Sequence, residues 1–484
     1  SQYESELAGL SDYESETYRK ILYQKNFVER TGYDFLITLA AENENNREAL
    51  EWFLDDFEAL DYYANAGNTI LGSYEKAAMV LTQLYKNYSL DMSNSLYKRM
   101  FVSLMFSHAG SIYFWADSTK TSNPVRRYAI YKKLYENGCL VNSVFENLTV
   151  PEMRWVMNSI SDDNQIEWLN YYVRKKSAAK AGVAFDELED NQLILNSYSY
   201  MGYITGYNYY LDKYYTDENK ASWTEKYHLV NTDDDTNDDI YDINIPFESG
   251  HPKLWIVFEE GAVCGGISKV GVNLLTAFGI PSVVIGQPGH AAYLRYDLDD
   301  PSKGENALAK WSIWNDVYGW TKSERGDTLL LGWGAQSWAK GYRVSYVPLA
   351  QAALNDYDNF KKAEDLVKIA QMTDSDKAIK LYRQALEIQN FNLDAWDGLI
   401  TAYKSAEKTS ADYIELAKEI ISALTYFPQP MNDMLQNAIK PEISSEADIA
   451  DFNIMTLTAL KSASIATSTE SLQPDICKTM ANYI

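Results

Sequence analysis

Apolar residues recur at helical spacing after Cys264, and this pattern constrains the fold more than any other feature of the chain. The cysteine is followed at 3, 6, 7, 10, 11 and 14 positions by Ile267, Val270, Gly271, Leu274, Leu275 and Phe278. That spacing is typical of one buried face of a helix. Gly279 and Pro281 come next and predict the end of the helix. The sequence therefore predicts that Cys264 stands on the first turn of a core helix.

The residues beside Cys264 suit a reactive thiol. The start of a helix carries unpaired N–H groups and a partial positive charge, and both favour the nucleophilic thiolate. Gly265 and Gly266 are poor helix formers, so we expect them to let a substrate main chain approach the sulfur. Cys139 and Cys477 lack such a setting, and three cysteines do not make a disulfide framework.

Three short strands are predicted after this helix. Residues 282–286 form an apolar run, Gln287-Pro288-Gly289 form a turn, and residues 290–296 alternate between two faces. A polar loop leads to a third strand, residues 311–316. A helix packed on a small antiparallel sheet is an α+β arrangement.

Cys264, His290 and one of two neighbouring polar residues form a candidate catalytic set. A thiolate can attack an acyl carbon, an imidazole can take and return the proton, and a third residue can orient the imidazole. The third residue is Asn315 or Asp316. Strand alternation groups Asn315 with Trp311, which favours Asn315 and leaves Asp316 as the alternative.

This stretch resembles the transglutaminase-like core, a relative of the papain-like cysteine proteases. The matching motifs are G-x-x-C-G-G at 261–266, L-L-x-A-x-G-I-P at 274–281, G-H-A at 289–291 and the strand WSIWND at 311–316. The resemblance implies that Cys264 is the nucleophile and His290 the base. The family usually has Asp four positions after the strand tryptophan, where this chain has Asn315, and often has Trp where this chain has Ala292.

The resemblance also implies a reaction class and a location. It implies acyl transfer from an amide of a protein or peptide through a Cys264 thioester, with water favoured over an amine as acceptor, and with no cofactor and no metal. Peptidase, amidase or deamidase activity follows from water, and crosslinking from an amine. The phrases GAVCGGIS and NDVYGW resemble large secreted Gram-positive bacterial proteins, which implies an extracellular or cell-surface location. No apolar segment follows Ser1, so we expect that any export signal has been removed.

Substrate contacts are predicted from the needs of the reaction. An oxyanion hole, the set of donors for the developing negative charge, should include the Cys264 main-chain N–H and one further donor. The candidates for that donor are Trp223, Trp255 and Gln287.

The regions on either side of the core are predicted to be helical. Residues 1–230 form an all-helical region, residues 245–348 the α+β core, and residues 349–484 a helical region that resembles tetratricopeptide (TPR) repeats. Within the first region, residues 50–60 show the spacing of one helix, and residues 149–152 form a capping box that opens another. Helix breaks are expected at residues 65–67 and 137–138.

Charge and composition exclude some partners. The chain has 43 basic and 68 acidic residues, a net charge of −25, so nucleic acid and anionic lipid surfaces are not expected partners. No apolar run reaches the ~18 residues of a membrane span. The acidic stretch 233–239 has calcium-loop spacing but lacks the required Gly and Glu, so it is predicted to be a solvated linker. The alternative to an enzyme is a catalytically inert surface protein whose helices and many aromatics bind a glycan or a protein.

Overall fold

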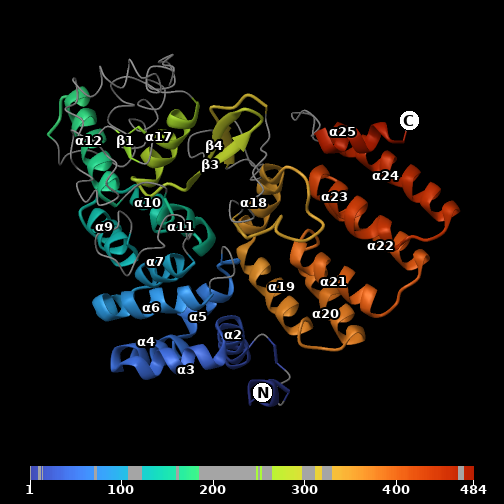
Figure 1. The fold of residues 1–484 in the computed structure, drawn as a ribbon, viewed down its shortest axis with the longest axis horizontal. Helices are drawn as coiled ribbons and strands as arrows, with labels where there is room; N and C mark the ends of the chain where they lie inside the picture. Colours follow the sequence, from blue (N-terminus) through green and yellow to red (C-terminus); the bar gives the residue numbers. More distant parts are fainter. Residues whose placement is uncertain are drawn as a thin grey trace. The chain divides into compact units, whose positions relative to one another are not determined.

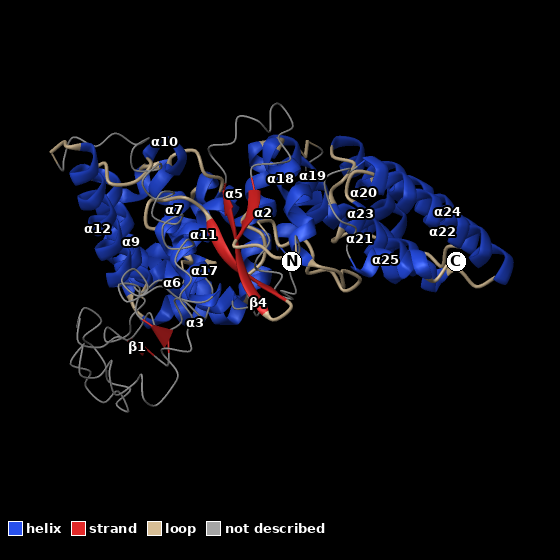
Figure 2. Cartoon of the chain, turned by 90° about the horizontal axis from the view of Figure 1, so that it is seen from above, coloured by secondary structure: helices blue, strands red, loops and turns tan. Residues whose placement is uncertain are grey.

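The computed structural model describes residues 2–8, 12–13, 15–69, 74–106, 123–159, 163–184, 247–248, 251–252, 264–296, 311–318, 330–466 and 474–483. This part of the chain is mostly helical (Figure 1), and its strands form one three-stranded sheet and the short pair β1 (Phe247–Glu248) and β2 (His251–Pro252) (Figure 2). The predicted α+β class is consistent with this. None of the helices in these ranges is long and apolar enough to cross a membrane.

The chain divides into two compact units. The sheet unit comprises residues 28–296 and 312–317, and the C-terminal unit comprises residues 1–27, 297–311 and 318–484. Helix α2 (Glu16–Thr31) and strand β5 (Trp311–Trp314) run across the division. Helix α1 (Gln2–Ala8) belongs to the C-terminal unit.

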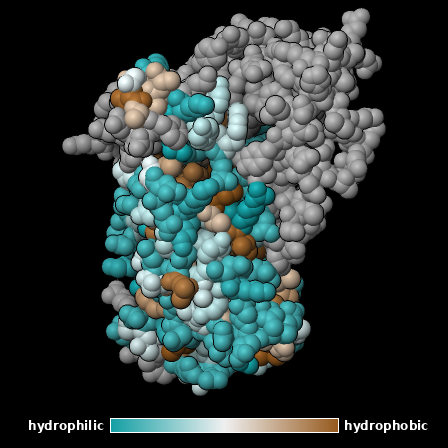
Figure 3. All heavy atoms as spheres, turned by 90° about the vertical axis from the view of Figure 1, so that its left-hand side faces the viewer, coloured by the Kyte–Doolittle hydropathy of each residue, from teal (hydrophilic) through white to brown (hydrophobic). Residues whose placement is uncertain are grey.

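Helices form most of the sheet unit. They are α3 (Tyr33–Glu42), α4 (Glu44–Asp55), α5 (Phe57–Ala64), α6 (Tyr74–Tyr88), the 3₁₀ helix η2 (Ser89–Ser93), α7 (Ser95–Met105), α9 (Pro124–Glu136), α10 (Asn142–Phe145), α11 (Val150–Met157) and α12 (Asp163–Ala181). Their core holds fully buried aromatic side chains, among them Phe53, Tyr63, Phe101 and Tyr128. The part of the face that Figure 3 shows in colour is mostly hydrophilic, with apolar residues scattered over it, as is normal for a solvated surface.

The helical spacing over residues 50–60 does not form one helix. Helix α4 ends at Asp55, and the Asp56 side chain accepts a hydrogen bond from the Ala59 N–H at 2.9 Å. An aspartate that accepts from the N–H three residues later caps a helix N-terminus, so a new helix, α5, begins at Phe57. The prediction of a single helix was wrong because apolar spacing continues through this cap.

Other local signals are confirmed. The Thr149 N–H and hydroxyl donate to Glu152 Oε2 at 2.9 and 2.8 Å and open α11, which is the predicted capping box. The break at residues 65–67 follows the end of α5. At residues 137–138, the end of α9 places Gly138 at φ +62°, in the left-handed region that favours glycine.

The sheet is built on a tight hairpin. Strand β3 (Ser282–Gln287) pairs antiparallel with β4 (His290–Tyr296), with Gln287 opposite His290, and β5 lies on the other side of β4. Helix α17 (Cys264–Thr276) packs on β4 so closely that a Cβ at Gly271 would lie 2.5 Å from the Tyr293 ring.

The end of α17 has the predicted glycine. Gly279 has φ +80°, its N–H donates to the Thr276 carbonyl, and the Ile280 N–H donates to the Leu275 carbonyl, both at 3.0 Å. This pair of bonds is a Schellman motif, which satisfies carbonyls that the helix leaves unpaired. The predicted helix from Cys264 to the Gly279 stop is confirmed.

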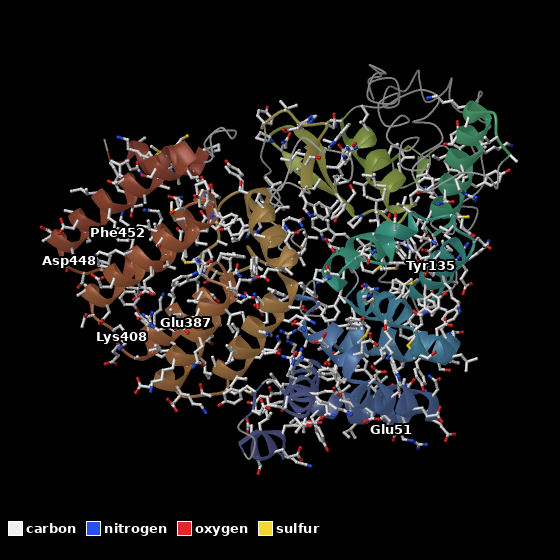
Figure 4. The ribbon with its side chains drawn as sticks, turned by 180° about the vertical axis from the view of Figure 1, so that it is seen from behind. Glu51, Tyr135, Glu387, Lys408, Asp448 and Phe452 are labelled. Carbon is white, nitrogen blue, oxygen red and sulfur yellow. The ribbon has the colours of Figure 1, made fainter. Side chains whose placement is uncertain are left out.

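The C-terminal unit is a succession of helices. They are η6 (Arg343–Tyr346), α18 (Val347–Asn355), α19 (Tyr357–Ala370), α20 (Ser375–Ile388), α21 (Leu393–Ser405), α22 (Ser410–Leu424), α23 (Pro428–Met434), η7 (Leu435–Ile439), η8 (Lys440–Glu442), α24 (Glu446–Ala466) and α25 (Pro474–Ala481). Figure 4 labels Lys408 and Asp448 of this unit, which lie at one edge of the ribbon. The predicted helical character is confirmed, and the resemblance to TPR repeats stays a prediction.

Three carboxyl groups, one buried and two half-buried, hold residues 330–346 against the helices of the C-terminal unit. The groups belong to Asp394 and Asp397 of α21 and Asp433 of α23. Their donors are Trp333 Nε1, Gln336 Nε2, Trp338 Nε1, the Gly341 N–H and the Tyr346 hydroxyl. Burial raises the pKa of all three carboxyls, that of Asp433 to about 6.

Candidate functional site

Cys264 is the first residue of α17 and its side chain is half-buried. This position confirms the predicted cysteine at a helix start. The other two cysteines differ from it: Cys139 is buried, and burial raises the pKa of its thiol, while Cys477 is exposed on α25. All three are free thiols. Cys264 therefore combines access to solvent with the N-terminus of a core helix.

The residue after Cys264, Gly265, has room for a side chain. A Cβ at Gly265 would meet no atom of the described residues within 4 Å, its two chain neighbours aside, whereas Gly266 is buried. Packing therefore does not require a glycine at position 265. The space is of the kind that a substrate main chain would need.

His290 begins β4 directly after the predicted turn. Gly289 has φ +64° and follows Pro288, the residue order that a type II turn prefers. The His290 ring is half-buried, and its Nε2 lies 2.5 Å from the main-chain carbonyl oxygen of Asn315. Because a carbonyl can only accept, Nε2 is the donor in this contact, and in the neutral imidazole the lone pair is then on Nδ1.

Asn315 is not on a strand. Strand β5 ends at Trp314, and Asn315 has φ +54°, a left-handed conformation that asparagine tolerates. The prediction that the strand continues to Asp316 was wrong, because this backbone turn ends the alternation on which the choice between Asn315 and Asp316 depended.

The Asn315 side chain points toward α17 and β4. Its Nδ2 donates to the Cys264 carbonyl at 3.2 Å, to Ser268 Oγ at 3.0 Å and to the Ala291 carbonyl at 3.0 Å. The main-chain carbonyl of the same residue faces His290. Asn315 thus connects the residue that bears the thiol with the start of the strand that bears the imidazole.

Asp316 and Gln287 interact with each other. Asp316 is exposed, and its Oδ1 accepts from Gln287 Nε2 at 2.7 Å. The Gln287 side chain is 5% exposed, and its Oε1 accepts from the Val317 N–H at 3.2 Å. Gln287 therefore anchors the loop that carries Asn315, and its predicted oxyanion contact stays a prediction.

Ser268 belongs to this site and was missed from the sequence. It is fully buried on α17, and its hydroxyl donates to the Ala291 carbonyl at 2.9 Å while accepting from Asn315. A hydroxyl residue four positions after Cys264, on the apolar face of the helix, was the signal that could have identified it.

A stacked pair closes the sheet beside the site. The Arg295 guanidinium lies 3.5 Å from the centre of the Trp314 ring, and Trp314 Nε1 donates to Ser312 Oγ at 3.0 Å. Cation–π contact of this kind fixes β5 on β4 immediately before Asn315.

Several predicted positions cannot be compared with the structure. Trp223, Trp255 and the acidic stretch 233–239 lie outside the described residues.

Within the ranges that are described, no group of three or more His, Cys, Asp or Glu residues is placed to hold a metal ion. In the same ranges no hydrogen bond joins the Cys264 thiol to His290, and the two residues are linked through Asn315.

Comparison with known proteins found no relative of this chain. The transglutaminase-like resemblance stays an interpretation of the sequence motifs. No protein-family model, no curated protein and no solved structure matches the chain.

Proposed function

We propose that the chain is a cysteine-dependent acyl-transfer enzyme that acts on amide bonds of proteins or peptides. The observation that carries this proposal is the contact between His290 Nε2 and the Asn315 carbonyl. It leaves the imidazole lone pair on Nδ1, the form that a general base needs. The Asn315 amide holds the Cys264 carbonyl from the same loop. The proposed nucleophile, the proposed base and the carbonyl that orients the base therefore belong to one hydrogen-bonded cluster.

The reaction begins with proton transfer from Cys264 Sγ to His290 Nδ1. The thiolate adds to the amide carbonyl carbon, and the carbonyl electrons move to oxygen. When the tetrahedral species collapses, the C–N bond breaks and Nδ1–H gives its proton to the leaving nitrogen. An amine departs and a thioester remains.

Water completes hydrolysis in the second half of the reaction. His290 Nδ1 takes one proton as the water oxygen attacks the thioester carbon. The C–S bond then breaks, the thiol regains the proton from Nδ1, and a carboxylic acid leaves. An amine in place of water would give a new amide.

Two further observations support this proposal. The first is the position of Cys264 at the start of α17, where helix N–H groups can stabilise a thiolate and, later, an oxyanion. The second is the open space beside Gly265. The missing thiol–imidazole hydrogen bond does not oppose the proposal, because such bonds are often long before substrate binds.

The test is site-resolved alkylation by iodoacetamide at pH 6.5, with mass spectrometry of each cysteine peptide. We expect Cys264 to be labelled faster than exposed Cys477, and His290→Ala to remove this advantage while labelling of Cys477 stays constant. Buried Cys139 should be labelled slowly in every variant. Equal labelling of Cys264 and Cys477 in the wild type would refute the enzyme and favour the inert surface protein.

Substrate chemistry is then read with a peptide library and hydroxylamine. An acyl hydroxamate product shows a trapped thioester, and it must be missing in Cys264→Ala. Without hydroxylamine, cleaved peptides indicate a peptidase, and conversion of glutamine or asparagine side chains to acids indicates a deamidase. A wild-type enzyme that produces none of these from the library would contradict the peptide-amide assignment.

A further inference from the structure

Asn315, in the loop after β5, contacts different partners with its main chain and with its side chain. The main-chain carbonyl accepts from His290 Nε2, and the side-chain Nδ2 faces three acceptors. Two of these acceptors are main-chain carbonyls, of Cys264 and Ala291, which can never donate. The atom that faces them must therefore be the amide nitrogen and not the amide oxygen.

Ser268 completes this arrangement. Its hydroxyl hydrogen points at the Ala291 carbonyl, so its lone pairs are available to Asn315 Nδ2. The buried hydroxyl therefore ties α17 to β4 both directly and through Asn315.

We infer that Asn315 and Ser268 are positioning residues, and that the acceptor that orients His290 is the main-chain carbonyl of Asn315 and not a side chain. This inference rests on the proposed function. The side-chain Nδ2 of Asn315 donates to the carbonyls of Cys264 and Ala291 and so holds these two residues at a fixed separation. The left-handed backbone of Asn315, φ +54°, is what turns its carbonyl toward the imidazole.

The inference reverses the effect expected of the most conservative substitution. If the side chain of residue 315 oriented the imidazole, Asn315→Asp would keep or improve activity, because a carboxylate is a stronger acceptor. With the geometry described here, the same substitution sets a carboxylate oxygen against two carbonyl oxygens at about 3 Å. Asn315→Gly instead keeps the carbonyl and suits the left-handed backbone.

The first test is the pH profile of iodoacetamide labelling of Cys264 in Asn315→Asp, Asn315→Gly and Ser268→Ala, with melting temperatures as the folding control. Asn315→Asp should lower His290-dependent labelling by about 100-fold, the loss typical of reacting groups displaced by ~1 Å. Ser268→Ala and Asn315→Gly should lose about tenfold, with the pH midpoint of the profile unchanged, because the carbonyl contact stays.

The second test is the tautomer of His290, read from ¹⁵N shifts of histidine-labelled protein and assigned with His290→Gln. Neutral His290 should carry its proton on Nε2 in the wild type and in Asn315→Gly, and proton occupancy of Nδ1 would overturn the inference. If Asn315→Asp fails to fold, the tautomer of His290 and the labelling of Cys264 in Ser268→Ala decide whether the inference holds.

The outcomes separate the inference from the proposed function. If Asn315→Asp labels as fast as the wild type while His290→Ala is slow, the inference is wrong and the proposed function stands. If His290→Ala labels as fast as the wild type, the proposed function fails, and the inference then holds or falls on the tautomer alone.

Discussion

Replacing Asp433 by Asn should make the C-terminal unit less sensitive to pH. Asp433 Oδ2 accepts from the Gly341 N–H at 2.7 Å and from the Tyr346 hydroxyl at 2.6 Å, and Oδ1 accepts from Gln429 Nε2 at 2.8 Å. An Asn oxygen can keep the first two bonds. Its NH₂ group would then face Gln429, whose Oε1 has no hydrogen-bond partner among the described residues and can turn to accept.

The magnitude follows from the pKa of Asp433. Burial raises it from 3.8 to about 6. A carboxyl with a raised pKa in the fold binds its proton more tightly there than in the unfolded chain, so its contribution to stability is full below about pH 4. That contribution is lost as the pH rises through 6. At about 1.4 kcal/mol for each pH unit between the two pKa values, the loss is about 3 kcal/mol, most of it between pH 4 and 6.

The assay is urea unfolding followed by tryptophan fluorescence from pH 4 to 8. Trp333 and Trp338 lie in the segment 330–346, which Asp433 helps to hold through Gly341 and Tyr346. The free energy of unfolding of Asp433→Asn should gain about 3 kcal/mol relative to the wild type across this range. Asp451→Asn, at an exposed position of α24, is the matched control and should follow the wild type. If the curves of Asp433→Asn and the wild type stay parallel, the burial argument is wrong.

Two further predictions concern packing in the sheet unit. Gly271→Ala places a Cβ 2.5 Å from the Tyr293 ring and should lower the free energy of unfolding by about 1–3 kcal/mol in urea titrations; an unchanged midpoint would show that the ring moves aside freely. Asp163→Asn removes the partner of Arg127 in an ion pair of 2.6 Å with both side chains fully buried, and should cost about 3–5 kcal/mol. Glu167→Gln, in a pair exposed to solvent, should cost under about 1 kcal/mol. Similar costs for the two acidic positions would contradict the assignment of the effect to burial.

The β3–β4 hairpin and helix α17 could be predicted because their signals are local. The stripe after Cys264, the Gly279 stop and the Pro288-Gly289 turn each depend on residues a few positions apart, and the structure has all three. Side-chain spacing alone did not reveal that Asp56 would interrupt an apolar face, although aspartate is among the best N-cap residues.

The third member of the candidate site could not be assigned from alternation. That reasoning holds only while the backbone stays extended, and the backbone leaves the extended region at Asn315. Main-chain acceptors have no sequence signature, so the contact of His290 with a carbonyl was invisible before the fold was known. Ser268 was missed for a related reason, since its two partners, Ala291 and Asn315, come from segments far from it in the sequence.

The pairing of Gln287 with His290 across the two-residue turn has a mechanical consequence. One strand end carries the His290 imidazole. The facing strand end holds, through Asp316 and Val317, the loop whose carbonyl the imidazole contacts. The imidazole and the Asn315 carbonyl that it contacts are therefore both attached to the same end of the β3–β4 hairpin. A bend introduced farther along β3 and β4 would therefore move the two together and leave the distance between them unchanged.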